Sequence, residues 1–124
     1  CFIKRMSSNN IQWHKLADHI NLLPWQPNNL CVVSVAGKYI TLARTSGDSI
    51  HACAHKCPHA SGIMADGFID ALGNIVCPLH RYKFALSNGR NVSGEGYYLK
   101  TYTVEQRADG WYIAFEKKGI FSWY

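Results

Sequence analysis

The 124-residue sequence has few charged residues and no clear helical pattern. Charged residues make up 17% of the chain, and Trp13–Ile20 is only a short, weak candidate for a helix. No apolar run approaches the length that crosses a membrane, and there is no internal repeat or low-complexity segment. With 48% hydrophobic and 13% aromatic residues, the chain has the composition of one globular domain without a membrane-spanning helix.

Basic residues outnumber acidic ones but do not gather in runs. The formal net charge of +5 and the pI near 9.0 indicate a surface that attracts anions or acidic protein faces. Only Lys4-Arg5 and Lys117-Lys118 are adjacent basic pairs, and no nucleic-acid recognition motif accompanies them. Residues 1–10 contain no apolar stretch long enough for a secretory signal. We therefore expect a cytoplasmic protein with no nucleic-acid or membrane partner.

Short segments rich in β-branched and aromatic residues alternate with turn residues, which is typical of an all-β sandwich or barrel. Hairpin turns are predicted at Gly37-Lys38 and at Ala108–Gly110, and Trp111, Ile113 and Phe115 should share one face. We expect one domain over 11–116, an N-terminal extension over 1–10 and an aromatic tail over 117–124 that folds back on the base. The predicted strands are 11–17, 30–36, 39–44, 50–56, 67–70, 74–77, 81–86, 99–105 and 110–116.

Two matched motifs supply the metal-ligating residues. Cys57-Pro58-His59 is followed, after a seventeen-residue gap, by Cys77-Pro78-Leu79-His80. Each motif offers one thiolate and one imidazole, the ligand set of an iron–sulfur cluster with two Cys on one iron and two His on the other. The intervening segments 67–70 and 74–77 predict a hairpin about Ala71-Leu72-Gly73 that brings the motifs side by side.

Two alternatives to this assignment remain open. Cys and His at short spacing also bind structural zinc, although zinc fingers usually pair Cys with Cys and His with His. In addition, Cys53-Ala54-His55 is a second Cys-x-His sequence, but it lacks the proline and lengthens the gap to Cys77. We expect Cys53 to be a buried strand residue and His55 a strand residue with a satisfied ring.

The remaining cysteines and histidines do not form another pattern. Cys1, Cys31 and Cys53 are an odd remainder, which argues against a disulfide scaffold. We expect the scattered His14, His19 and His51 to be ordinary surface or core residues.

The two motifs and their flanks, Cys57-Pro58-His59-Ala60-Ser61-Gly62 and Cys77 to Phe84, resemble the Rieske 2Fe–2S proteins. The resemblance implies that Cys57 and Cys77 hold the inner iron, and that His59 and His80 hold the outer iron near the surface. It also implies an antiparallel β base with a small inserted cluster-binding subdomain at about 55–90.

Residues near the motifs resemble the soluble ferredoxin branch of that family. Gly62 and Leu79 stand where respiratory-complex members have a second pair of Cys joined as a disulfide. Tyr82 and Phe84 stand where high-potential members have Ser and Tyr, whose hydroxyls donate to the cluster and to a Cys sulfur. We therefore expect a reduction potential toward the low end of the Rieske span of roughly −150 to +300 mV. Arg81 replaces the usual Gly, and its charge would raise the potential somewhat.

The resemblance implies a one-electron carrier between an NAD(P)H-dependent flavoprotein reductase and a terminal oxygenase, without catalytic residues of its own. Lys56, Arg81 and Lys83 would form a basic rim that docks an acidic face of the partner. A Rieske oxygenase would need a second iron domain, for which these 124 residues leave no room. The alternatives are a small Rieske subunit of a larger reductase complex and a zinc-stapled structural module.

Overall fold

The computed structural model describes residues 11–58, 62–79, 81–93 and 98–116. Within these ranges the regular elements are strands and two short 3-10 helices, η1 at Ile20–Leu22 and η2 at Met64–Asp66. The strands are β1 (Ile11–Ala17), β2 (Leu30–Val35), β3 (Lys38–Thr45), β4 (Ser49–Ala54), β5 (Phe68–Ile69), β6 (Asn74–Val76), β7 (Lys83–Ala85), β8 (Thr101–Tyr102), β9 (Val104–Arg107) and β10 (Gly110–Glu116).

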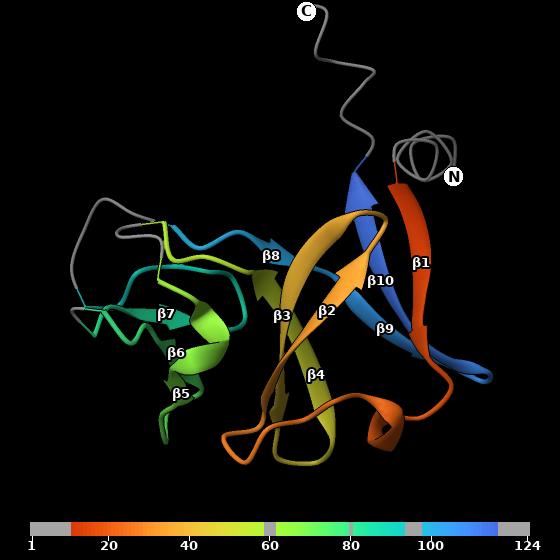
Figure 1. The fold of residues 1–124 in the computed structure, drawn as a ribbon, viewed down its shortest axis with the longest axis horizontal. Helices are drawn as coiled ribbons and strands as arrows, with labels where there is room; N and C mark the ends of the chain where they lie inside the picture. Colours follow the sequence, from red (N-terminus) through yellow and green to blue (C-terminus); the bar gives the residue numbers. More distant parts are fainter. Residues whose placement is uncertain (1–10, 59–61, 80, 94–97, 117–124) are drawn as a thin grey trace, which may run out of the picture.

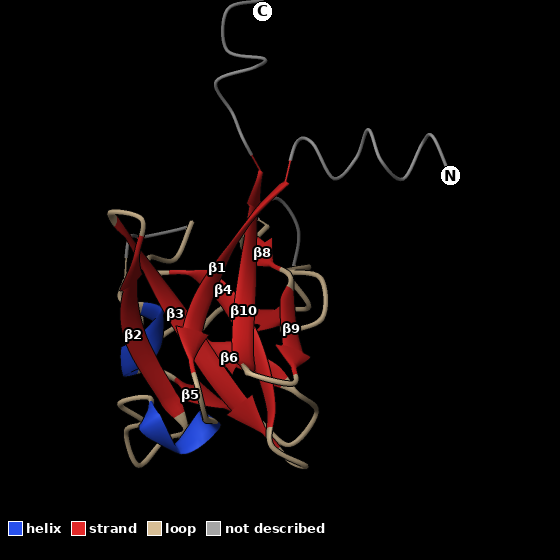
Figure 2. Ribbon diagram, turned by 90° about the vertical axis from the view of Figure 1, so that its right-hand side faces the viewer, coloured by secondary structure: helices blue, strands red, loops and turns tan. Residues whose placement is uncertain are grey.

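The strands form three antiparallel sheets, which confirms the all-β prediction. Their orders are β1-β10-β9, β2-β3-β4-β8 and β5-β6-β7. The first two sheets make up the base, and the third forms a smaller subdomain beside it (Figure 1). Seen from the side, β1 and β10 cross the strands of the second sheet (Figure 2). Neither of the helices in the described ranges is long and apolar enough to span a bilayer.

The core of the base lies between its two sheets. Ile40 and Leu42 of β3 are fully buried, and they belong to the same apolar cluster as Trp111 and Ile113 of β10. Phe115 packs against this cluster while remaining partly exposed, so the predicted face of β10 is confirmed. Complete burial of an Ile or Leu side chain contributes about 1.5–3 kcal/mol, so this cluster is a main source of stability for the base.

A second apolar cluster joins the base to the smaller subdomain. Leu30 and Cys53 come from base strands, and Met64, Ile75 and Phe84 come from the subdomain, all with essentially no exposed surface. Because one core includes residues of both parts, the subdomain is fixed to the base by packing as well as by chain connections.

The hairpin between β2 and β3 turns one residue earlier than the sequence suggests. Val35 pairs with Lys38, so the turn residues are Ala36 and Gly37, with φ angles of 51° and 79°. Two positive φ angles are typical of the type I′ turn, whose twist matches the strands it joins. The predicted turn at Gly37-Lys38 is therefore shifted by one position.

Other predicted boundaries also move where tertiary contacts decide them. Trp13–Ile20, the best candidate for a helix, is strand β1 up to Ala17, followed by loop residues and the start of η1. Strand β4 ends at Ala54, and the predicted strand 81–86 shortens to Lys83–Ala85. The N-terminal extension and the aromatic tail lie outside the described residues.

Candidate metal centre

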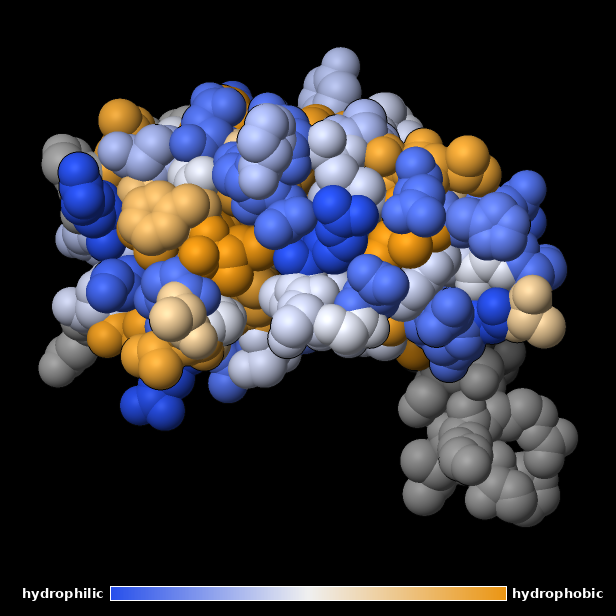
Figure 3. Space-filling view, turned by 90° about the horizontal axis from the view of Figure 1, so that it is seen from below, coloured by the Kyte–Doolittle hydropathy of each residue, from blue (hydrophilic) through white to orange (hydrophobic). Residues whose placement is uncertain are grey.

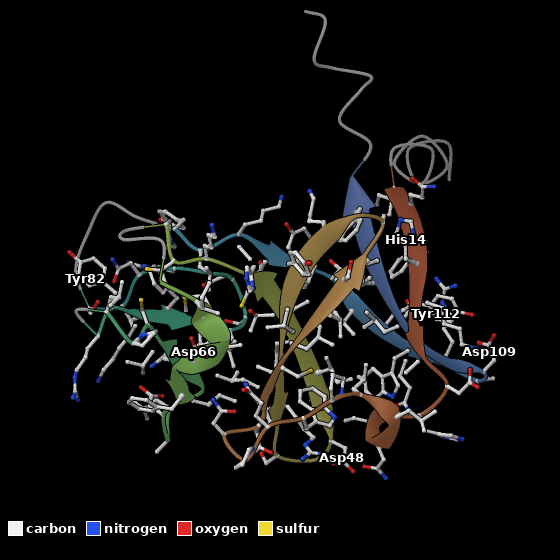
Figure 4. All side chains as sticks on the ribbon, viewed as in Figure 1. His14, Asp48, Asp66, Tyr82, Asp109 and Tyr112 are labelled. Atoms are coloured by element: carbon white, nitrogen blue, oxygen red, sulfur yellow. The ribbon has the colours of Figure 1, made fainter. Side chains whose placement is uncertain are left out.

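Two loops of the subdomain begin at the predicted cysteine ligands and close in the same way. The amide N of Cys57 donates to the carbonyl O of Gly62 at 2.7 Å, and the amide N of Cys77 donates to that of Tyr82 at 2.8 Å. Each hydrogen bond spans five residues, so the two cluster loops (residues 57–62 and 77–82) have matching closures. Tyr82 lies at the opposite end of the molecule from Tyr112 and Asp109 (Figure 4). The second cluster loop is therefore far from the sheet β1-β10-β9, called the outer sheet below.

The side chains of Cys57 and Cys77 meet between these loops. Cys57 is 2% exposed and Cys77 is fully buried, and both are free thiols. The thiols of Cys57 and Cys77 interact with each other, and the backbone of Leu79 also acts on the thiol of Cys77. The predicted hairpin of β5 and β6 thus does bring the two motifs side by side.

Burial is the main influence on the chemistry of Cys77. Loss of hydration raises the pKa of its thiol to about 11, and the neighbouring Cys57 adds to this shift, while the amide of Leu79 opposes it. A thiolate at this position therefore needs a compensating positive charge. A metal bound to the cysteine pair would supply that charge and would release the thiol protons.

The backbone at Gly62 packs closely against the sulfur of Cys77 and the side chain of Leu79. A Cβ atom at Gly62 would lie 3.1 Å from the side chain of Leu79 and 3.2 Å from Sγ of Cys77. Gly62 and Leu79, the predicted replacements for a disulfide, are thus in contact across the two loops. Together, the paired buried thiols, the amide donor and the side-chain-free backbone fit a cluster bound at this point.

The two predicted histidine ligands, His59 and His80, lie outside the described residues. Their immediate neighbours are described: Pro58 and Leu79 are exposed, and Leu79 retains 45% of its accessible surface. The cysteine side of the predicted site is therefore buried, while the residues that lead to both histidines reach the surface. The assignment of His59 and His80 to an outer iron stays a prediction.

The structure shows which of the two candidate Cys-x-His sequences contributes its cysteine to the site. Cys53 lies within β4, pairs across the sheet with Thr41 and Thr101, and has no exposed surface. Burial raises the pKa of its thiol to about 12. Cys57, rather than Cys53, carries the sulfur that contacts Cys77. The expectation that Cys53 is a buried strand residue is confirmed.

The expectation for His55 was wrong in part. His55 follows the last residue of β4, and its ring lies 5.5 Å from that of Tyr39. Its Nδ1 atom is buried and has no hydrogen-bond partner among the described residues. The ring is therefore packed but not satisfied, because the chain leaves the sheet at this residue.

The other histidines occupy separate parts of the base. His14 packs against Phe115 on the outer sheet, with 5.2 Å between ring centroids, and burial lowers the pKa of His51 in β4. His19 is exposed before η1. Across the described ranges, no three His, Cys, Asp or Glu side chains gather as a metal site.

The predicted basic rim consists of exposed side chains around the cluster loops. Lys56 forms a β-bridge with Ile63, Lys83 begins β7, and neither has a carboxylate within 4.0 Å among the described side chains. Arg81 is also exposed and has a φ angle of 56°, in the region that favours glycine. This conformation explains why glycine is usual after the second histidine of similar ferredoxins.

The aromatic residues after the second motif differ in their environment. Phe84 is fully buried in the shared core, and its ring lies 6.5 Å from that of Tyr82. A phenylalanine offers no hydroxyl, so position 84 provides no donor to the sulfur atoms. The structural setting supports the expectation of fewer donors than in high-potential members.

Sequence reasoning missed two side-chain amides that attach the subdomain to the base. Nδ2 of Asn28 donates to the carbonyl O atoms of Ala65 at 3.0 Å and Gly67 at 2.9 Å, and Nε2 of Gln26 also donates to Ala65 at 3.0 Å. These bonds connect the loop before β2 to the helix η2, between the cluster loops. No local pattern reveals partners about forty residues apart in sequence.

A family model settles the class of the site. The model of the Rieske [2Fe-2S] domain matches residues 12–103, about three quarters of the chain. The chain belongs to this family. It therefore carries a Rieske-type 2Fe–2S cluster and functions in electron transfer, and the zinc alternative is not supported.

Solved structures with the same fold include ferredoxins and reductase subunits. One such structure is the complex of reduced oxygenase and oxidized ferredoxin in carbazole 1,9a-dioxygenase. A chain of that complex is 27% identical to this protein at a TM-score of 0.69, and the match covers 86% of this chain and 95% of the chain in the complex. The ferredoxin of carbazole 1,9a-dioxygenase from Nocardioides aromaticivorans has 23% identity and a TM-score of 0.69, with 86% and 99% covered. A putative NADH-dependent nitrite reductase small subunit from Mycobacterium tuberculosis has 22% identity and a TM-score of 0.71, with 85% and 96% covered.

A curated relative matches over a shorter stretch. The 4beta-methylsterol monooxygenase of Methylococcus capsulatus is 34% identical over 59 residues, which are 48% of this chain. The match covers only 16% of that monooxygenase.

Proposed function

We propose that Cys57 and Cys77 bind the inner iron of the cluster and that His59 and His80 bind the outer iron. The observation that carries this assignment is the contact between the two cysteine sulfurs, at the start of two loops with matching closures. We also place the domain boundaries at 11–116 and the cluster-binding subdomain at about 55–90. The shared core supports one folding unit that contains both parts.

The chain then acts as a one-electron carrier between an NAD(P)H-dependent flavoprotein reductase and a terminal oxygenase. A bound Rieske cluster supplies reversible one-electron chemistry. The similarity to the ferredoxin structures extends over 95% or more of their chains, whereas only 29% of the terminal oxygenase of carbazole 1,9a-dioxygenase from Novosphingobium is covered. The match over nearly the whole length of these ferredoxin chains supports the carrier role, which we propose for a cytoplasmic protein.

Partner docking is proposed at the surface around the cluster loops. The exposed side chain of Leu79 provides an apolar contact, and the exposed residues Lys56, Arg81 and Lys83, which lie in or next to the cluster loops along the chain, provide positive charge. An apolar centre with a charged rim is typical of protein interfaces. Acidic residues on the partner would increase its association rate, and salt would reduce that rate.

A second candidate function is a small subunit of a larger reductase complex. The similarity to the nitrite reductase small subunit from Mycobacterium tuberculosis favours it, because 96% of that chain is covered at a TM-score of 0.71. In that case the cluster would relay electrons within a stable assembly. The acceptor would then be bound permanently rather than met by diffusion.

Purification from the native source, followed by a coulometric titration, tests the carrier function. A carrier should purify without a large subunit and should take up one electron per 14.0 kDa chain. Constant co-purification with a large subunit at equal stoichiometry would contradict the carrier role and support the subunit. Seen from below, apolar side chains gather at the end that carries the subdomain and are separated by polar side chains elsewhere (Figure 3).

A further inference from the structure

A groove in the base has no role in the function described so far. It has a volume of about 380 Å³ and lies where β8, the end of β10 and the start of β3 meet. Strand β8 lies between the cluster subdomain and β10, so the groove is on the subdomain side of the outer sheet (Figure 1). Its lining includes Lys38, Lys100, Tyr102 and Phe115.

Two lysines lie above an aromatic floor in this groove. Nζ of Lys38 is 5.5 Å from the ring centroid of Phe115, and Nζ of Lys100 is 5.7 Å from that of Tyr102. The two rings contact each other edge to face, with 5.2 Å between their centroids. The groove thus combines two ammonium groups with an apolar surface.

Neither lysine is neutralised by a carboxylate among the side chains that the structure describes. Among the described side chains, the ion pairs of the base involve Lys15 and Arg107, and none includes Lys38 or Lys100. Two cations that line one concave surface increase the local positive potential, which attracts acidic groups. The groove therefore has the charge that an acidic ligand requires.

The backbone of the groove favours an extended peptide as that ligand. Strand β8 pairs with β4 and stands at the end of the strand order β2-β3-β4-β8. Thr101, Tyr102 and Thr103, which include this edge strand, line the groove. Edge strands bind extended peptide segments by adding a strand, although the carbonyl O of Thr103 already accepts a hydrogen bond of 2.9 Å from the amide N of Ala114 in β10.

The groove is also connected to the strand that leads into the first cluster loop. The carbonyl O of Lys100 accepts a hydrogen bond of 2.8 Å from the amide N of Ala54, three residues before Cys57. Tyr39, which follows Lys38, packs against His55. The backbone of Lys100 in the groove is thus joined directly to the strand that precedes the first cluster loop.

We propose that the groove binds an acidic segment of the protein that exchanges electrons with the cluster. Aspartate or glutamate carboxylates of this segment contact Lys38 and Lys100, and an apolar side chain packs on Tyr102 and Phe115. The identification of the bound protein as the electron-transfer partner rests on the proposed carrier function. The groove thereby adds a second binding site, separate from the basic rim at the cluster loops.

Fluorescence anisotropy with the cluster-containing protein tests this proposal. The probe is a short fluorescein-labelled peptide rich in glutamate and containing one leucine. The double variant Lys38→Gln/Lys100→Gln should bind it about tenfold more weakly, the combined effect of losing two moderate ion pairs. The control Arg44→Gln/Arg90→Gln removes the same charge, from the other end of β3 and from the subdomain, and should change binding less than about twofold.

Equal weakening in the two double variants would show that binding follows net charge alone and would overturn the proposal. A labelled oligothymidylate provides a second comparison. If its binding depends on Lys38 and Lys100 as strongly as peptide binding does, the choice of a protein segment as the ligand is overturned. Groove-dependent peptide binding in a protein with no cluster signal in electron paramagnetic resonance would instead contradict the carrier function. A normal cluster signal without groove-dependent binding would contradict the groove proposal alone.

Discussion

The backbone of Gly62 faces the side chain of Leu79 so closely that a Cβ atom at position 62 would lie 3.1 Å from it. This contact joins the two cluster loops where similar respiratory-complex proteins have a disulfide. A glycine and a leucine thus take the place of a covalent link. The loops are held by this packing, by their own backbone closures and by the shared core.

Replacing this glycine tests how tightly the loops pack. In Gly62→Ala the new methyl group must displace Leu79 or Cys77, and we expect a loss of about 1–3 kcal/mol in the free energy of unfolding. The bound iron per chain should also fall. Denaturant titration and iron analysis provide the measurement. Unchanged stability and iron in Gly62→Ala would show that the loops tolerate a side chain there.

Arg81 allows charge and backbone strain to be separated. Its φ angle of 56° is unfavourable for a side chain, so Arg81→Gly should stabilise the protein by about 1 kcal/mol. The same variant removes a cation near the cluster and should lower the reduction potential. Arg81→Lys keeps both the charge and the strain, so neither property should change much. A potential that stays constant in Arg81→Gly would show that this exposed charge has no effect on the cluster.

Asn28 is expected to stabilise the position of the subdomain on the base. Asn28→Ala removes the hydrogen bonds to the carbonyl O atoms of Ala65 and Gly67, although Ala65 keeps its bond from Gln26, and the loss should cost about 1–3 kcal/mol. Urea titration measures this change. Asn21→Ala is the matched control, because Asn21 is exposed and makes no side-chain hydrogen bond. If the two variants are equally stable, the amide of Asn28 has no structural importance.

Two buried thiols predict a loss of stability at alkaline pH. Burial raises the pKa of Cys31 and of Cys53 from 9.0 to about 12. Because the folded state holds these protons more tightly than the unfolded chain, their contribution is complete below pH 9. It falls as the pH rises toward 12, by at most about 1.4 kcal/mol per pH unit for each thiol. Denaturation curves of Cys31→Ala should show a shallower alkaline decline than those of the unmodified protein. Parallel declines would contradict this account.

The sequence was sufficient to predict the approximate positions of most strands and the proximity of Cys57 and Cys77, but the predicted strand 99–105 is divided into β8 and β9, which belong to different sheets. Strand patterns and motif spacing can be read from short stretches of sequence. The predicted hairpin of β5 and β6 then brings Cys57 and Cys77 together. The partners of Asn28 and the orphaned ring of His55 depend on residues brought together only by the fold. The strained angle at Arg81 breaks a local rule, and no propensity predicts it.

The most direct test of the central claim is electron paramagnetic resonance on dithionite-reduced protein, comparing Cys57→Ser, His59→Ala and Cys53→Ala. Mixed Cys and His ligation gives a rhombic signal. We expect this signal in the unmodified protein and in Cys53→Ala, and its loss in Cys57→Ser and His59→Ala. A signal that survives in Cys57→Ser, or disappears in a folded Cys53→Ala protein, would contradict the proposed ligand set.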